Sequence, residues 1–324
     1  MPRYPGITSD AFRHPLDLEA ELALRSLPGF DLIARKFLEF MVDRPQLIYN
    51  MGNSIQVGPR QYASVYQPYR ECLQSLDIYP EPALFVTQTP TVNAYTIGQE
   101  QPSVVLTSGA LDLLSEAELR AVIAHELGHF KCGHAILTQM AIWAIYAASM
   151  VGQFTLGVSN LLINGALIAS FYEWKRKAEL SSDRAALLVT DDVDTVLMTL
   201  IKLAGGSGTH SQEISLDEFR RQARDYRDLD NDGLNQLYKL LLQNNLPQGV
   251  FMTHPFPVER VSFLEEWADS DEYRRIRNGD YAQDPAEGSV DVPSNNNGAA
   301  EAERLRQQIE ELQQQINRIR NDEP

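Results

Sequence analysis

The feature that most constrains the fold is a helix, predicted to begin at Ser115, that carries two histidines one turn apart. Ser115 followed by Glu118 forms a capping box, in which each side chain binds a backbone N–H at the start of a helix. Side chains four residues apart lie on one helical face, so His125 and His129 are neighbours. We expect this helix to continue as far as Met150. The sequence thus predicts one long helix with paired imidazoles on one side.

Paired imidazoles of this kind can hold a metal ion. Two neutral histidines bind Zn²⁺ at about 2.0–2.1 Å each. Glu126 follows the first of them, where its carboxylate can take a proton from a metal-bound water that attacks a carbonyl carbon. The His-Glu-x-x-His pattern also arises by chance, and then the histidines only decorate a helix. Histidine is scarce here, with six in the chain, which favours the metal.

A catalytic zinc site needs a third protein ligand and an open position. Glu179 is the better candidate, because it shares a helix face with Asp183, which can orient a ligand imidazole from outside the coordination sphere. Glu173 is a rival that lacks an acid four residues later. The alternative is a solvated acidic face on a charged helix. His134 does not have the spacing of a metzincin ligand, and we interpret it as a core or surface histidine.

Three short segments before the histidine-bearing helix are predicted strands, and the last two form a hairpin: 83–87, 93–97 and 103–107. The fold class expected is α+β and predominantly helical, with a small sheet beside that helix. The chain is divided into an N-terminal helical region, a core, a flexible linker and a terminal coiled-coil helix: 1–78, 79–275, 276–300 and 301–321.

An apolar helical hairpin is predicted at 135–172. Residues 132–172 contain no Asp, Glu, Lys or Arg. A membrane span needs about 20 apolar residues, so each arm of the hairpin is borderline. The hairpin is either buried in the protein core or associated with a membrane, and we favour the membrane.

The tail at 301–321 has a heptad pattern. Its apolar residues are spaced 4-3-4-3: Leu305, Ile309, Leu312, Ile316 and Ile319. This pattern favours a parallel homodimer. The alternative is a single amphipathic helix that docks elsewhere on the protein.

The charge and cysteine content limit the partners and the compartment. The formal net charge of −16 repels phosphates, so we exclude nucleic acid as a partner. Cys72 and Cys132 are the two cysteines and do not make a disulfide framework, which favours a reducing compartment. Residues 1–30 lack the apolar stretch of a secretory signal. We expect a cytoplasmic protein, free or on the inner, cytoplasmic face of a membrane.

In combination these motifs resemble the M48 family of gluzincin peptidases, which includes the HtpX and Ste24-type proteases. The similarity extends over about residues 80–268 in the correct order. Besides His-Glu-Leu-Gly-His, it includes four segments: Arg176–Asp183, Asn93–Gly98, Val104–Leu111 and Thr253-His254-Pro255 followed by Arg260. The N-terminal spanning helices of the membrane members are missing from this sequence, which puts integral membrane topology in doubt.

The resemblance implies a gluzincin-type domain with one Zn²⁺ per chain. It implies that His125, His129 and Glu179 bind the metal, that Glu126 is the general base and that Asp183 supports a ligand histidine.

For the substrate, the resemblance implies that an extended peptide pairs with the edge of a strand, with Asn93, Val104 and Val105 as binding residues. His254 would donate a hydrogen bond to the tetrahedral oxyanion, with a packing role at a helix start as its alternative. Arg260 is interpreted as structural.

We therefore predict a zinc-dependent endopeptidase that hydrolyses polypeptide substrates through a Glu-activated metal-bound water, in protein quality control or maturation. No motif indicates the terminal-group site that an exopeptidase would need. The alternative from another class is a zinc-stabilised scaffold that dimerises through 301–321 and does not cleave. We also hypothesise that the helices of 1–78 cover and gate the cleft.

Overall fold

The computed structural model describes residues 2–27, 30, 44–98, 102–140, 158–229 and 257–283, and their side chains except at 44–46 and 158–169. Several predictions fall outside these residues and are neither supported nor contradicted by the structure. They concern His254, positions 141–157 of the apolar hairpin, the linker from residue 284 onward and the coiled-coil helix at 301–321.

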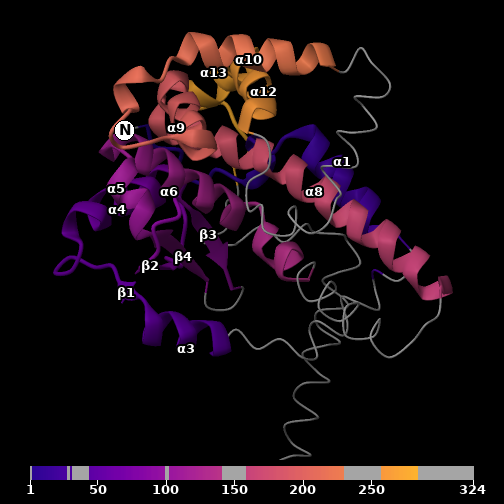
Figure 1. Cartoon of the computed structure of the whole chain (residues 1–324), viewed down its shortest axis with the longest axis horizontal. Coiled ribbons are helices and arrows are strands. Elements are labelled where there is room, and N and C mark those ends of the chain that lie inside the picture. The colour runs from indigo at the N-terminus through magenta and orange to yellow at the C-terminus, as the bar shows by residue number, and fades with distance from the viewer. Residues whose placement is uncertain are drawn as a thin grey trace, which may run out of the picture. The chain divides into compact units, whose positions relative to one another are not determined.

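Helices make up most of the described chain (Figure 1). The α-helices are α1 (Pro15–Arg25), α3 (Arg44–Asn53), α4 (Ala63–Ser75), α5 (Ser108–Leu113), α6 (Glu116–Lys131), α8 (Val158–Thr190), α9 (Val193–Gly205), α10 (Leu216–Asp228), α12 (Pro257–Ala268) and α13 (Asp271–Arg277). Residues 134–140 are also helical. Two short 3₁₀ helices are η1 (Ser9–Ala11) and η2 (Ser211–Glu213).

One mixed sheet of four strands lies beside α6, as predicted (Figure 1). Its strands are β1 (Ile55–Gln56), β2 (Ala83–Thr87), β3 (Ala94–Ile97) and β4 (Ser103–Thr107), in the spatial order β1-β2-β4-β3. β4 pairs parallel with β2 and antiparallel with β3, with Val105 opposite Tyr95. All five residues of β4 are buried, as is typical of an inner strand with apolar residues on both faces. The predicted hairpin is therefore β3–β4, and β3 is the outermost strand on its side of the described sheet.

Helix α6 begins where the sequence predicts and ends earlier. The capping box is present: the Glu118 carboxylate accepts a bond from the Ser115 N–H at 2.7 Å, and the Glu118 N–H donates to Ser115 Oγ at 3.4 Å. The prediction of a continuous helix to Met150 is wrong, because α6 ends at Lys131. Gly133 follows with a φ of 71°, a left-handed conformation that suits glycine and stops a helix. The helical turns after it start at His134.

A glycine lets α6 and α8 pack closely. A Cβ on Gly128 would lie 2.7 Å from Ala185 Cβ and 3.0 Å from Ser182 Cα, so no larger residue fits without a shift. The two helices form the most extensive packing between elements of the described chain. Gly128 stands between the two histidines of α6, so the close approach brings α8 directly against the residues that the sequence marks as metal ligands.

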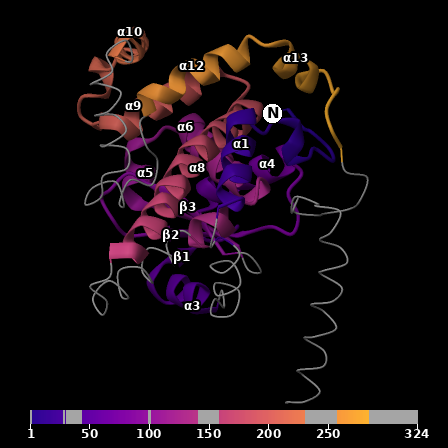
Figure 2. The ribbon, with the colours of Figure 1, turned by 90° about the vertical axis from the view of Figure 1, so that its right-hand side faces the viewer.

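The N-terminal helix α1 runs along α8 (Figures 1 and 2). Its Leu24 joins an apolar cluster with Leu137, Met140, Phe171 and Trp174. The described ends of the predicted apolar hairpin are thus buried against α1. No helix of the described residues combines the length and the apolar character needed to cross a membrane.

Candidate metal site

Three predicted ligands converge at the contact between α6 and α8. His125 Nε2 lies 3.2 Å from His129 Nε2 and 3.3 Å from Glu179 Oε2. His129 Nε2 lies 3.4 Å from the other oxygen of the same carboxylate, Glu179 Oε1. All three ligand groups lie within 4.8 Å of one another. The histidines come from consecutive turns of α6, and Glu179 comes from the facing turn of α8. The structure therefore brings together the three residues that were predicted from the sequence to hold the metal.

The spacing of these atoms fits a tetrahedral zinc ion. Two ligand atoms that bind at about 2.0–2.1 Å with a tetrahedral angle between them are about 3.3–3.4 Å apart. The separation of 3.2 Å between the two Nε2 atoms is close to this value, and each Nε2 lies at a similar distance from one of the two Glu179 oxygens, 3.3 Å for Oε2 and 3.4 Å for Oε1. Two imidazole nitrogens and one carboxylate oxygen leave the fourth position open, which is the arrangement of catalytic rather than structural zinc sites.

The ring of His125 contacts Asp183, the residue expected to orient it. Its Nδ1 lies 3.1 Å from Asp183 Oδ1, so the N–H on this side points away from the ligand atom. Arg260 of α12 holds Asp183 in turn, with a bond of 2.7 Å from Nε to Oδ2 and a second bond to Oδ1. Its Nη1 also lies 3.1 Å from Glu179 Oε2. Arg260 thus contacts both carboxylates of the candidate site, and its interpretation as a structural residue stays a prediction.

Burial and charge shift the pKa values of the site residues in different directions. Burial lowers the pKa of His125, but the carboxylates of Asp183 and Glu179 outweigh it and raise the value to about 9. These carboxylates favour a positive charge at the place where a cation would bind. For His129, burial dominates and lowers the pKa to about 4, so this imidazole is neutral at pH 7. Burial would raise the pKa of Asp183, but Arg260 and His125 hold it below its usual range.

His129, the second predicted ligand, contacts a different residue through its other ring nitrogen. His129 Nδ1 lies 2.9 Å from His134 Nδ1, and His134 is 1% exposed. His134 is therefore a core histidine that contacts a ligand, rather than a member of the ligand cluster. Its spacing gave no signal, because residues five apart do not share a face of a continuous helix.

The predicted base, Glu126, is held by the sheet. Its side chain is 1% exposed, and its Oε2 lies 2.9 Å from Thr96 Oγ1 of β3. The same hydroxyl is 2.9 Å from the backbone oxygen of Glu126, and its single proton serves one acceptor at a time. Sequence analysis did not identify Thr96, because the pairing depends on how β3 packs against α6.

A cavity of about 270 Å³ lies next to these residues. Tyr95, Thr96 and Ile97 of β3 line one side, and Lys175 and Glu179 of α8 line another. Burial lowers the pKa of Lys175, although Glu179 and Glu126 act in the opposite direction. An extended segment of a few residues could lie in this space beside Glu126 and His129.

The substrate-binding prediction places the peptide on the wrong strand. Val104 and Val105 are fully buried in β4, which has β2 on one side and β3 on the other. An inner strand has no free edge, so neither residue can pair with a peptide by strand addition. Asn93 immediately precedes β3, and its backbone oxygen accepts a bond from the Thr107 N–H at 3.1 Å. A role for Asn93 toward substrate stays a prediction.

Comparison with known proteins identifies relatives of this chain. The sequence model described as Peptidase family M48 matches residues 59–268. An Arabidopsis thaliana protein named plastoglobule-localized metallopeptidase 48, chloroplastic, is 34% identical over 276 residues, which cover 84% of this chain and 76% of that protein.

More distant relatives come from bacteria and archaea. A protease HtpX homolog of Polynucleobacter necessarius subsp. necessarius (strain STIR1) is 26% identical over 247 residues, covering 70% of this chain and 81% of that protein. The protease HtpX homolog 2 of Methanosarcina mazei is 25% identical over 209 residues, covering 58% and 67%. No solved structure matches the chain.

Proposed function

This chain belongs to peptidase family M48 and is a metalloprotease, and from that premise we propose that it is a zinc-dependent endopeptidase with one metal ion per chain. In this proposal His125, His129 and Glu179 bind the zinc, Asp183 orients His125, and Glu126 is the general base. The observation that carries the proposal is the convergence of the two histidine Nε2 atoms and the Glu179 carboxylate, at separations of 3.2, 3.3 and 3.4 Å.

The residues around the ligands support general-base catalysis. A zinc ion bound there would supply Lewis acidity and lower the pKa of water. Glu126 adjoins the first ligand on α6, and Thr96 holds its carboxylate at 2.9 Å. From this position Glu126 can accept the proton of the attacking water and deliver it to the leaving amine of the peptide bond.

An extended polypeptide is the substrate class that the cavity supports. β3 lines the cavity together with Glu126 and His129, and it is the outermost strand on this side of the described sheet. A peptide that adds to β3 would place its carbonyl groups next to the base. Substrate peptides with N-methyl groups at alternate positions should therefore be cleaved poorly in one register and normally in the other. Equal cleavage in both registers would contradict strand addition.

The test of the proposed base is Glu126→Gln. This change keeps the shape of the side chain and removes its ability to take a proton, so cleavage of casein should fall by about 10²–10⁴-fold while zinc stoichiometry stays at that of the wild type. Glu116→Gln is the matched control, because Glu116 is on the same helix and its side chain is 72% exposed. Unchanged cleavage in Glu126→Gln refutes the assignment of the base. Zinc binding without cleavage of any protein by the wild type would favour the scaffold.

Mass spectrometry of the products distinguishes an endopeptidase from an exopeptidase. An endopeptidase yields internal fragments at early times, whereas an exopeptidase shortens its substrate from one end. A role in quality control predicts faster cleavage of unfolded casein than of a folded protein of similar size. Equal rates would favour maturation of defined substrates.

Contact with a lipid surface through 135–172 is a further part of the proposal. It is supported by the absence of charged residues at 132–172 and by the name of the plastoglobule-localized relative. We place the protein in a reducing compartment, on the cytoplasmic face of a membrane, which fits the two free cysteines. Flotation with phospholipid vesicles should recover the wild type and lose Leu161→Glu. Recovery of both, or of neither, would contradict this role for 135–172.

Self-association through 301–321 is proposed from the heptad pattern alone. Analytical ultracentrifugation should find a dimer for the full chain and a monomer for Ile316→Lys. A monomeric wild type would contradict it.

A further inference from the structure

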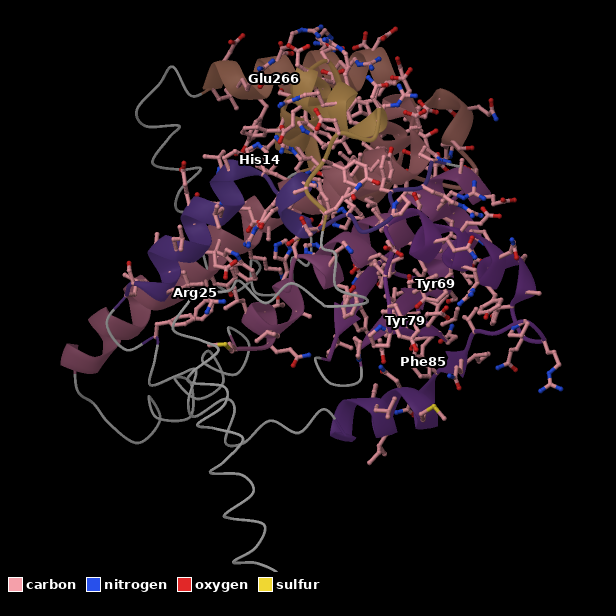
Figure 3. The ribbon with its side chains drawn as sticks, turned by 180° about the vertical axis from the view of Figure 1, so that it is seen from behind. His14, Arg25, Tyr69, Tyr79, Phe85 and Glu266 are labelled. Carbon is pink, nitrogen blue, oxygen red and sulfur yellow. The ribbon has the colours of Figure 1, made fainter. Side chains whose placement is uncertain are left out.

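A chain of buried side chains connects the second metal ligand to the N-terminal helix. His129 Nδ1 lies 2.9 Å from His134 Nδ1, and His134 Nε2 lies 3.0 Å from Asp17 Oδ2. Asp17 is on α1, 117 residues away from His134 in the sequence, and it is 0% exposed. Figure 3 shows α1 beside α8, with His14 labelled at the start of α1 and Arg25 labelled at its end.

The proton positions in this chain follow from the proposed ligation of His129. If Nε2 of His129 binds the metal, its Nδ1 carries the proton and donates it. The only group of His134 at this contact is Nδ1, which must then accept with its lone pair. His134 therefore carries its own proton on Nε2 and donates it to Asp17 Oδ2. One tautomer of His134 satisfies both of its contacts, and a carboxylate at Asp17 is what selects it.

The break after α6 makes this contact geometrically possible. In a continuous helix a residue five positions later points about 140° away from the first. Gly133, with a φ of 71°, ends α6 and redirects the chain, so that the ring of His134 returns to the back of His129. The edge of the Trp174 ring of α8 closes the other side, with ring centroids 5.7 Å apart.

Asp17 is fixed more firmly than a contact to one histidine requires. Arg13 donates to both of its oxygens, from Nε at 2.9 Å and from Nη2 at 3.2 Å. Ser181 Oγ donates to Oδ2 at 2.7 Å and accepts the His14 N–H at 3.0 Å. Ser181 stands on α8 between Glu179 and Asp183, so α1 is attached to the turn of α8 that carries the third ligand.

We propose that Asp17 is a positioning residue of the metal site, which fixes the orientation and the tautomer of His129 through His134. The inference rests on the proposed metal site and extends it to α1, which lies outside the residues 59–268 matched by the family. It also changes the hypothesis for the N-terminal region. In this inference helix α1 supports the ring of His129 through His134, and this role differs from that of a gate over the cleft.

The test compares two carboxylates of α1 in the full-length protein. Asp17→Ala should weaken Zn²⁺ affinity, measured by competition with a chromogenic chelator, by up to about 10–100-fold, the loss that is usual for residues outside the coordination sphere that orient a ligand histidine. Glu21→Ala is the matched control, because Glu21 is buried on the same helix and pairs with the same Arg13 but does not contact His134. Its affinity should stay within about threefold of the wild type.

Two additional variants separate positioning from general destabilisation. Asp17→Asn keeps an acceptor oxygen for His134, so it should recover most of the affinity that Asp17→Ala loses. His134→Phe removes the connection while keeping a ring, and adding Asp17→Ala to it should cause no further loss. The visible spectrum of the Co²⁺-loaded protein should change in Asp17→Ala and stay unchanged in Glu21→Ala.

The possible failures are distinguishable. Wild-type affinity in Asp17→Ala, or an equal loss in Glu21→Ala, overturns the inference while the proposed function stands. If Asp17→Ala does not fold, retained affinity in His134→Phe overturns it instead. A wild-type protein that binds no zinc overturns the proposed function and this inference together.

Discussion

The two halves of helix α6 both bury charged or ionisable side chains, but they arrange them in opposite ways. In the first half, Glu118 accepts bonds from the Ser115 N–H and from Lys202 Nζ, each at 2.7 Å. In the second half, His125 and His129 direct their Nε2 atoms at each other, 3.2 Å apart, and at the Glu179 carboxylate.

This difference distinguishes a structural polar cluster from a binding site. Around Glu118 every contact joins a donor to an acceptor, so the cluster is satisfied by the protein itself. At the other end the two imidazole Nε2 atoms and the Glu179 carboxylate converge, and a bound cation would accept the lone pairs of all three groups together. Changes at the ligand end should therefore affect hydrolysis most, and changes at Glu118 should affect it least.

Removal of one ligand should have the largest effect. Glu179→Ala leaves two imidazoles, which is fewer than the three protein ligands of a catalytic zinc site. We expect zinc content, measured by elemental analysis, to fall from one ion per chain to near zero, and casein hydrolysis to fall below detection. Glu118→Gln should keep its zinc. Full metal content in Glu179→Ala would remove this residue from the site.

Separation of the two helices should have the next largest effect. Gly128→Val adds atoms where a Cβ alone would already lie 2.7 Å from Ala185 Cβ. Such overpacking costs about 1–3 kcal/mol of unfolding free energy. The substitution should also move Glu179 relative to the α6 ligands. Zinc affinity should therefore fall by more than the loss of unfolding free energy alone would explain. Gly205→Val serves as a surface control, since a Cβ there meets nothing within 4 Å. A stable Gly128→Val protein with normal zinc affinity would contradict the role of this contact.

Loss of the hydroxyl that holds the base should have a smaller effect. Thr96→Val keeps the shape of the side chain and removes the bond to Glu126 Oε2. We expect kcat to fall by about tenfold with zinc content unchanged, which corresponds to about 1.4 kcal/mol in the transition state. Thr96→Ser retains the hydroxyl and should stay close to the wild type. If the two variants have the same kcat, the hydroxyl does not position the base.

Glu118→Gln should have the smallest effect on hydrolysis and a measurable effect on stability. The buried pair with Lys202 is lost, which costs about 1–3 kcal/mol of unfolding free energy at pH 7. Burial alone would raise the pKa of Glu118, but Lys202 and Ser115 hold it below its usual value.

The stabilisation by Glu118 is therefore present above the unfolded pKa of about 4.3 and is lost as the pH falls through the lower folded value. Urea unfolding of both proteins at several pH values checks this. A difference in stability that stays constant down to pH 3 would contradict the assigned pKa shift.

Features encoded by neighbouring residues could be predicted, whereas features that depend on packing could not. The start of α6 is encoded by two residues three positions apart, and the capping box is present. The end of α6 was missed although Gly133 is a typical helix-terminating residue, because the apolar residues after it continue the helical spacing. Asp17 has no local signal, since its partner is 117 residues away.

The wrong strand assignment had a signal that could have corrected it. The segment Ser103–Thr107 is apolar on both faces, which is typical of an inner strand rather than an edge strand. Helical spacing pairs His125 with His129 and Glu179 with Asp183, but the meeting of the two pairs depends on how α6 packs against α8 and was expected from the family resemblance. Which strand lies at the edge of the sheet next to these residues depends on the strand order β1-β2-β4-β3, and no local sequence pattern encodes that order.

A crystal structure of the zinc-soaked protein, with anomalous data collected on both sides of the zinc absorption edge, would show where the metal binds. We expect one anomalous peak per chain, within about 2.0–2.2 Å of His125 Nε2, His129 Nε2 and a Glu179 oxygen. His134 Nδ1 should stay outside the coordination sphere. A peak bound to His134, or one without Glu179, would rule out the proposed zinc ligands.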